Sequence, residues 1–174
     1  SFNQDAAADG QPEWEKFTDG VFGEKAPIAR KTYEARRPGE AARELISAVN
    51  TDISFRQPAQ TLAESRTSSG TPSWMYWFTW ASPAFGGMLG SAHALDIPFA
   101  FDNLDAPRVR GLLGHDSDTG NLAAEFADHI VHFAVHGHAA WAQYDRGRGA
   151  TLRMDVISEL LDHPENEIHS LFGN

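Results

Sequence analysis

The sequence contains no cysteine, which limits the chemistry that its 174 residues can carry. Disulfide bonds, thiolate metal sites and a cysteine nucleophile are all excluded. No apolar run approaches the length needed to cross a bilayer. The N-terminal stretch SFNQDAAADGQPEWEKF has neither the basic nor the apolar region of a signal peptide. From these absences we expect no membrane contact and a reducing location such as the cytoplasm.

Basic residues are also few. Lys and Arg number 14 against 24 Asp and Glu, which gives a formal net charge of −10. An acidic surface repels phosphates and no basic stripe offsets it, so we expect no nucleic-acid binding. Hydrophobic residues make up 41%, enough for a packed core in one domain or a large piece of one. Position 1 is not a methionine, and we expect the chain to begin inside a longer protein.

The periodicity of apolar residues predicts several helices and two strands. The helices are expected over residues 14–22, 26–36, 40–66, 121–135 and 156–161, and the strands over residues 73–80 and 151–154. Residues 1–12 are expected to form a loop, and Pro58 should kink or split the third helix. Two strands cannot form a sheet that covers so many helices. The remaining strands should therefore lie in another segment, and the chain should not fold alone because its sheet edges would be exposed.

One histidine, His93, lies in a glycine-rich loop directly after the aromatic strand at 73–80. Gly86, Gly87 and Gly90 indicate a loop whose backbone needs unusual torsions. A neutral imidazole can take a proton from a hydroxyl and return it to a leaving group near neutral pH. Spacing alone does not separate this role from that of a histidine which only hydrogen-bonds a nearby carbonyl.

A longer pattern surrounds this histidine. The stretch WMYWFTWASPAFGGMLGSAHALDIPFAFDNL resembles the type-B carboxylesterases, in which an aromatic strand precedes Gly-x-x-His-x-x-(Glu/Asp)-(Leu/Ile)-Pro-(Phe/Tyr)-x-Phe. The matching residues here are Gly90, His93, Asp96, Ile97, Pro98, Phe99 and Phe101. The resemblance extends to YEARRPG at 33–39, TDISFR at 51–56 and WAQYD at 141–145, where Ala142 replaces the usual proline.

The resemblance implies an α/β class. Residues 1–174 would be the C-terminal segment of an α/β-hydrolase catalytic domain, with helices and the last strands of its central sheet, incomplete without an N-terminal segment. It places the catalytic histidine at His93. It also implies hydrolysis of a small-molecule carboxylic ester through a Ser-(Glu/Asp)-His triad and an acyl-enzyme, without a cofactor. Phe85, Met88 and Leu89 are near His93 in sequence and could line the substrate pocket; packing into the core is the alternative.

The serine of such a triad is not in the sequence. No serine stands in a Gly-x-Ser-x-Gly elbow, and Ser91, which follows Gly90, has no glycine two residues later. The chain order of this fold is serine, acid, histidine, so the serine is expected before residue 1. The acids near the family's triad spacing are Asp5, Asp9, Glu13 and Glu15, and none follows a strand-like run. We expect the acid on the N-terminal segment as well.

Two other functions compete with the esterase interpretation. His129, His132 and His136 share one face of the helix at 121–135 and could bind Zn²⁺. A solvated histidine face is favoured, because the apolar stripe of that helix points elsewhere and one straight helix seldom supplies three ligands. The other alternative is a non-catalytic, esterase-fold binding protein; the presence of His93 argues against it.

Overall fold

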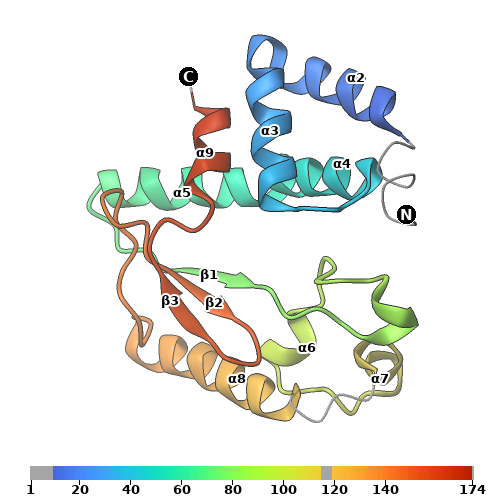
Figure 1. Ribbon diagram of the computed structural model, residues 1–174. Helices are drawn as coiled ribbons and strands as arrows, with labels where there is room; N and C mark the ends of the chain where they lie inside the picture. The colour runs from blue at the N-terminus through green and yellow to red at the C-terminus, as the bar shows by residue number, and fades with distance from the viewer. Residues whose placement is uncertain (1–9, 115–118, 174) are drawn as a thin grey trace. The chain divides into compact units, whose positions relative to one another are not determined.

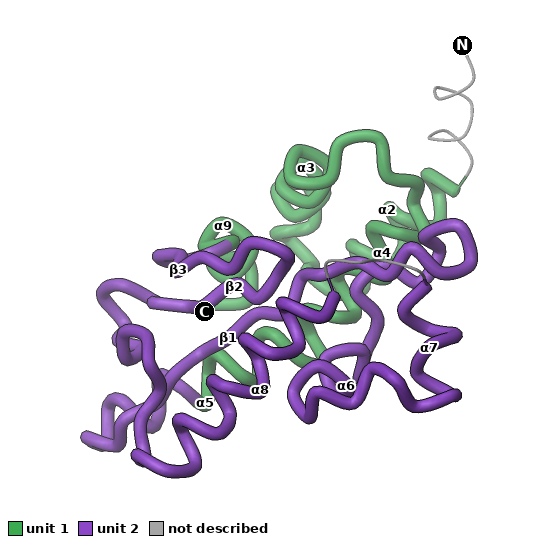
Figure 2. Tube along the Cα trace, turned by 90° about the horizontal axis from the view of Figure 1, so that it is seen from below, with its two compact units in different colours: residues 1–62, 165–174 green, residues 63–164 purple. Residues whose placement is uncertain are grey.

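The computed structural model describes residues 10–114 and 119–173. The chain divides into two compact units, residues 1–62 with 165–174 (unit 1) and residues 63–164 (unit 2), shown in Figure 2. Each unit has its own cluster of buried apolar side chains. Residues 1–9 of the predicted N-terminal loop, with Asp5 and Asp9, lie outside the described residues. None of the helices described is both long and apolar enough to cross a membrane.

Unit 1 is helical. Its elements are α2 (Gln11–Phe22), η1 (Gly23–Lys25), α3 (Ala26–Arg36), α4 (Ala42–Thr51), η2 (Asp52–Arg56), the first half of α5 (Gln57–Ser68), and α9 (Asn166–Phe172) (Figure 1). The core is formed by fully buried side chains that include Trp14, Tyr33, Val49 and Ile168. Helix α2 begins inside the predicted loop because Pro12 suits a first turn, where its missing N–H would have no partner.

The predicted helix at 40–66 is confirmed as a helical run, and Pro58 does not split it but lies in the first turn of α5. The run extends from α4 through η2 to α5, and η2 is a π-helical segment over Asp52–Arg56 directly before the proline. A proline removes one backbone donor and its ring crowds the preceding turn. Widening that turn into a π-type bulge relieves the conflict, and such bulges also bend helices.

Unit 2 is a three-stranded sheet with helices. Its elements are β1 (Met75–Phe78), η3 (Ala84–Gly87), α6 (Ile97–Ala100), α7 (Pro107–Leu113), α8 (Thr119–His136), β2 (Thr151–Met154) and β3 (Glu159–Leu161). The strand order is β1-β2-β3, with β1 parallel to β2 and β3 antiparallel. Met75 pairs with Thr151 and Phe78 with Met154, so both parallel strands end at the same edge of the sheet.

The helix predicted over residues 156–161 is wrong, because this segment contains strand β3. The acid and hydroxyl residues at 155–158 form a turn, in which Asp155 Oδ1 accepts the Val156 N–H at 2.8 Å. The strand is then held by a cross-strand ion pair between Arg153 and Glu159, 2.9 Å apart. The sheet therefore has three strands rather than two, and the last helix, α9, follows Pro164.

Alternate aromatic side chains in and just after β1 pack against helices α8 and α6 to form the core of unit 2. The rings of Tyr76 and Phe78 face Phe126 of α8 at 5.1 and 6.1 Å between centroids, and Trp80 lies 5.1 Å from Phe99 of α6. Helix α8 covers one face of the sheet (Figure 1). Strand β1 pairs only with β2 among the described residues, so its other edge carries no neighbouring strand there.

Candidate functional site

The loop that carries His93 leaves the carboxyl end of β1 and is closed on itself. The Ser82 N–H donates to the Gly90 carbonyl at 3.0 Å, and the buried Ser82 hydroxyl donates to the carbonyl of Leu112. The predicted unusual torsions are confirmed, because Gly86, Gly87 and Gly90 all have positive φ. These three positions let the chain reverse within a few residues without a Cβ clash.

His93 is held between two anchored neighbours. On its N-terminal side, the Ser91 hydroxyl donates to the Phe78 carbonyl at the end of β1, 3.1 Å away. On its C-terminal side, Leu95 and Phe99 are buried in the core of unit 2. His93 itself is exposed. The fold therefore fixes the backbone on both sides of an accessible imidazole.

The acid of the esterase-like pattern, Asp96, is tied to β1. The Tyr76 hydroxyl donates to Asp96 Oδ2 at 3.0 Å. Burial, with the nearby Asp96 carboxylate, raises the pKa of Tyr76 to about 12, so the hydroxyl remains a donor throughout the neutral range. Sequence reasoning missed this pairing of residues 20 positions apart, although both belong to the quoted pattern.

The suggested pocket residues differ in exposure. Phe85 is 62% exposed and Met88 is 85% exposed, so neither packs into the core of unit 2. Leu89 is half-buried. Phe85 also has a positive φ of 54°, which is unfavourable for a bulky side chain. The loop thus presents two large apolar side chains to its surroundings.

A second acid, Asp155, lies at the carboxyl end of β2, the parallel neighbour of β1. Its Oδ2 accepts the Thr79 hydroxyl at 2.6 Å, and its Oδ1 caps the turn to β3. Sequence reasoning did not single it out. The first bond joins the ends of the two parallel strands and the second holds the turn that follows β2, so the role of Asp155 is structural.

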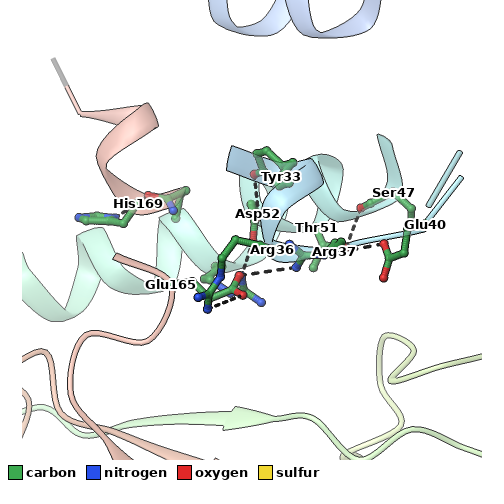
Figure 3. Close-up of polar contacts among 11 residues, drawn as sticks. Tyr33, Arg36, Arg37, Glu40, Ser47, Thr51, Asp52, Glu165 and His169 are labelled. Atoms are coloured by element: carbon green, nitrogen blue, oxygen red, sulfur yellow. Dashed lines mark hydrogen bonds and ion pairs between the residues drawn. The ribbon is translucent and has the colours of Figure 1, made fainter. Parts of the chain in front are cut away.

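Two of the three other motifs of the resemblance, at 33–39 and 51–56, meet inside unit 1 (Figure 3). The Tyr33 hydroxyl donates to Asp52 Oδ2 at 2.6 Å, and Arg56 lies 2.8 Å from Asp52 Oδ1 and 2.7 Å from Glu165. Arg36 and Arg37 also pair with Glu165. Burial is the main cause that raises the pKa values of Asp52 and Tyr33. The motifs at 33–39 and 51–56 therefore build the frame of unit 1.

The histidines of α8 do not group as predicted. His129 packs edge-on against Trp141 and lies 3.7 Å from Glu125. His129 and His132 are half-buried, so the expected solvated face is wrong for them, whereas it holds for His136. The described part of the chain contains no group of three or more His, Asp or Glu residues that could hold a metal ion.

No family model matches the chain. Among curated proteins, the chain is 29% identical over 122 residues to the para-nitrobenzyl esterase of Bacillus subtilis (strain 168). This match covers 67% of the chain and 24% of that protein. The solved structures that the chain resembles include three esterases. A Geobacillus stearothermophilus carboxylesterase superposes with a TM-score of 0.72 and 22% identity, and the match covers 94% of this chain and 36% of that one. A PNB esterase has a TM-score of 0.72 and 23% identity, over 92% of this chain and 33% of that one. An esterase from Clostridium hathewayi that can hydrolyze aliphatic aromatic polyesters has a TM-score of 0.67 and 20% identity, over 98% of this chain and 33% of that one.

The chain matches only part of the length of each of these proteins. It spans 24% of the length of the curated relative, and 33–36% of the three solved structures. A small sheet flanked by helices is what a segment of the α/β-hydrolase fold contains. The similarity to the type-B carboxylesterases predicted from the sequence is confirmed, and the chain has the fold of a part of an α/β-hydrolase.

Proposed function

We propose that this chain acts in carboxylic ester hydrolysis, with His93 as the proton-transferring residue of a Ser-(Glu/Asp)-His triad. The serine and the acid are supplied by a segment outside these 174 residues. One observation carries the proposal: His93 is exposed on a loop that is anchored on both sides, directly beyond the carboxyl end of a parallel strand. In open α/β sheets, ligands bind outside the carboxyl ends of the strands.

The chemistry follows from the position of the imidazole. The serine hydroxyl attacks the ester carbonyl while His93 takes its proton, and backbone N–H groups stabilise the oxyanion. His93 then returns the proton to the leaving alcohol as the acyl-enzyme forms. In the second half, His93 removes a proton from water as the water attacks the acyl-enzyme, and it returns that proton to the serine oxygen as the carboxylic acid leaves.

The free edge of β1 supports a partner segment. Among residues 10–114 and 119–173 no strand pairs with the outer edge of β1, and such an edge is a ready template for further strands. Near that strand, Ile97 and Phe101 of the esterase-like pattern are 53% and 75% exposed. We propose that the segment with the Gly-x-Ser-x-Gly serine adds strands at this edge and covers these side chains. The chain alone is then catalytically inert.

Phe85, Met88 and Leu89 are the proposed contribution of this chain to the substrate pocket. The first two are large, apolar and exposed on the same loop as His93. Apolar walls with few polar groups are typical of small-ligand sites. In the assembled enzyme, these side chains would contact the acyl or alcohol part of a small ester.

The test is the His93→Ala substitution in the enzyme assembled from this chain and the serine-bearing segment. Removal of the triad histidine should lower kcat for a short p-nitrophenyl ester about 10⁴- to 10⁶-fold. His163→Asn is the matched control, because His163 is another exposed histidine of unit 2 and asparagine tolerates its positive φ. Undiminished hydrolysis by His93→Ala would overturn the proposal. Ester binding without hydrolysis by the unmodified enzyme would instead favour the non-catalytic alternative.

A further inference from the structure

The loop that carries His93 has a single buried side chain, and that side chain is polar. All of residues 81–94 are described, and Ser82 is the only one of them that is buried, with 1% of its surface exposed. An alanine would occupy such a place without the cost of removing a hydroxyl from water. What a serine adds here is the set of hydrogen bonds that its hydroxyl makes.

Ser82 joins the two ends of the loop to helix α7. Its N–H donates to the Gly90 carbonyl at 3.0 Å, which closes the loop. Its hydroxyl donates to the carbonyl of Leu112, in the last turn of α7, and accepts the Ala84 N–H at 3.1 Å. The hydroxyl therefore both donates and accepts, which fixes its orientation. One residue thus connects the start of the loop, the end of the loop and α7.

The end of α7 is itself fixed in unit 2. Leu113 is buried in the core of this unit. Gly114 follows it with a φ of 69°, and a Cβ added there would lie 2.9 Å from Pro83 Cγ and 3.4 Å from the Ala84 nitrogen. The chain after α7 therefore packs closely against the base of the His93 loop. Through this contact and the bond to the Leu112 carbonyl, the loop base is held relative to the core.

The bonds of Ser82 bear on His93 because Gly90 lies only three residues before the histidine. Between them, the Ser91 hydroxyl donates to the Phe78 carbonyl, but Ser91 is exposed and water competes for that bond. The hydroxyl of Ser82 is buried, where a hydrogen bond is stronger than in water. Ser82 therefore provides the firmer constraint on the N-terminal side of the imidazole.

We propose that Ser82 is a positioning residue for His93. Its hydroxyl holds the loop base on α7, so that the imidazole meets the attacking serine at the distance that proton transfer requires. This role rests on the proposed function of His93, and Ser82 acts through the backbone rather than on the reacting atoms. Without the hydroxyl, the Ala84 N–H and the Leu112 carbonyl lose this partner and the loop base is free to shift. A misplacement of about 1 Å can cost a factor of about 10² in rate.

The experiment is Ser82→Ala in the enzyme assembled from this chain and the serine-bearing segment. Hydrolysis of a short p-nitrophenyl ester is measured in conditions where urea denaturation shows the variant to be fully folded. kcat should fall about 10- to 100-fold while KM changes less than about threefold, because the geometry of proton transfer changes and the substrate contacts do not. Thr151→Val is the matched control, since it removes another buried hydroxyl of unit 2, which donates to the Gly149 carbonyl at 3.0 Å. It should leave kcat unchanged.

Two further variants separate positioning from a general effect on the fold. Ser82→Ala added to His93→Ala should lower the residual rate no further, because Ser82 acts only through the imidazole. Gly114→Ala crowds Pro83 from the side of α7 and should also lower kcat. Gly111→Ala, in open space within α7, should leave kcat unchanged.

Several results would overturn the positioning role of Ser82. They are an unchanged kcat in Ser82→Ala, a change confined to KM, an equal loss of kcat in Thr151→Val, or an equal further loss in the His93→Ala background. If Ser82→Ala does not fold, an unchanged kcat in Gly114→Ala would overturn it instead. Failure of the proposed function would look different, since His93→Ala would then hydrolyse the ester at the full rate.

Discussion

The packing of Phe99, six residues after His93, allows the loss of stability on its substitution to be predicted in kcal/mol. Phe99 is fully buried, and its ring lies 5.1 Å from the rings of both Phe78 and Trp80. A buried phenylalanine removes about 200 Å² from water, which at about 25 cal/mol/Å² sets an upper value near 5 kcal/mol. Measured Phe→Ala costs in cores are about 3–5 kcal/mol. Phe99→Ala should therefore remove about 4 kcal/mol from the free energy of unfolding of unit 2.

The assay is urea denaturation of the assembled protein, followed by tryptophan fluorescence. Four of the five tryptophans lie in unit 2, so the signal reports mainly on that unit. Phe85→Ala is the matched control, because it makes the same chemical change at an exposed position of the same loop. It should change the free energy of unfolding by less than about 0.5 kcal/mol. Similar losses in the two variants, or a loss below about 1 kcal/mol for Phe99→Ala, would refute the view that this ring anchors the loop.

Three further predictions concern backbone space, a hydrogen bond and a buried charge. Gly114→Ala should destabilise unit 2 by about 1–3 kcal/mol in the same assay, because Gly114 has a φ of 69° and a Cβ there would lie 2.9 Å from Pro83 Cγ. Gly111 lies within α7 with open space around it, so Gly111→Ala should instead stabilise unit 2 by about 0.5–1 kcal/mol. Tyr76→Phe should cost about 0.5–1.5 kcal/mol through the lost hydrogen bond at 3.0 Å, and no loss would show that bond to be unimportant. In the fold, the pKa of the Asp52 carboxyl is raised above its ordinary value of 3.8. The protonated carboxyl is therefore the form that favours folding: its contribution to stability is fully present below pH 3.8 and is lost as the pH rises through the folded pKa. The free energy of unfolding relative to Asp52→Asn should therefore fall as the pH rises from 3.8 toward neutrality, and a rise would contradict the assignment.

Local patterns predicted the parts of the fold whose causes are local. The glycines at 86, 87 and 90 indicated positive torsions because few other residues accept them, and the structure has them there. The periodic helices α3 and α8 were also predicted closely. These features depend on neighbours within one or two turns, which a sequence displays directly.

The features that were missed depend on contacts across a turn or a loop. Strand β3 is held by the pairing of Arg153 with Glu159 across a turn, and the apolar spacing before it fitted a helix equally well. The half-buried state of His129 comes from Trp141, which follows a glycine turn that the helical pattern does not encode. For the site, the sequence pattern gave His93, but the tie from Tyr76 to Asp96 needed the register of β1 against the loop.

The most direct measurement for the proposed role of His93 is a complementation titration. The serine-bearing segment is held constant, this chain is added stepwise, and hydrolysis of a short p-nitrophenyl ester is followed. Activity should rise from a negligible value and saturate at one chain per segment with the natural sequence, and it should stay negligible with His93→Ala. Full activity of the segment without this chain, or equal activation by His93→Ala, would contradict the account.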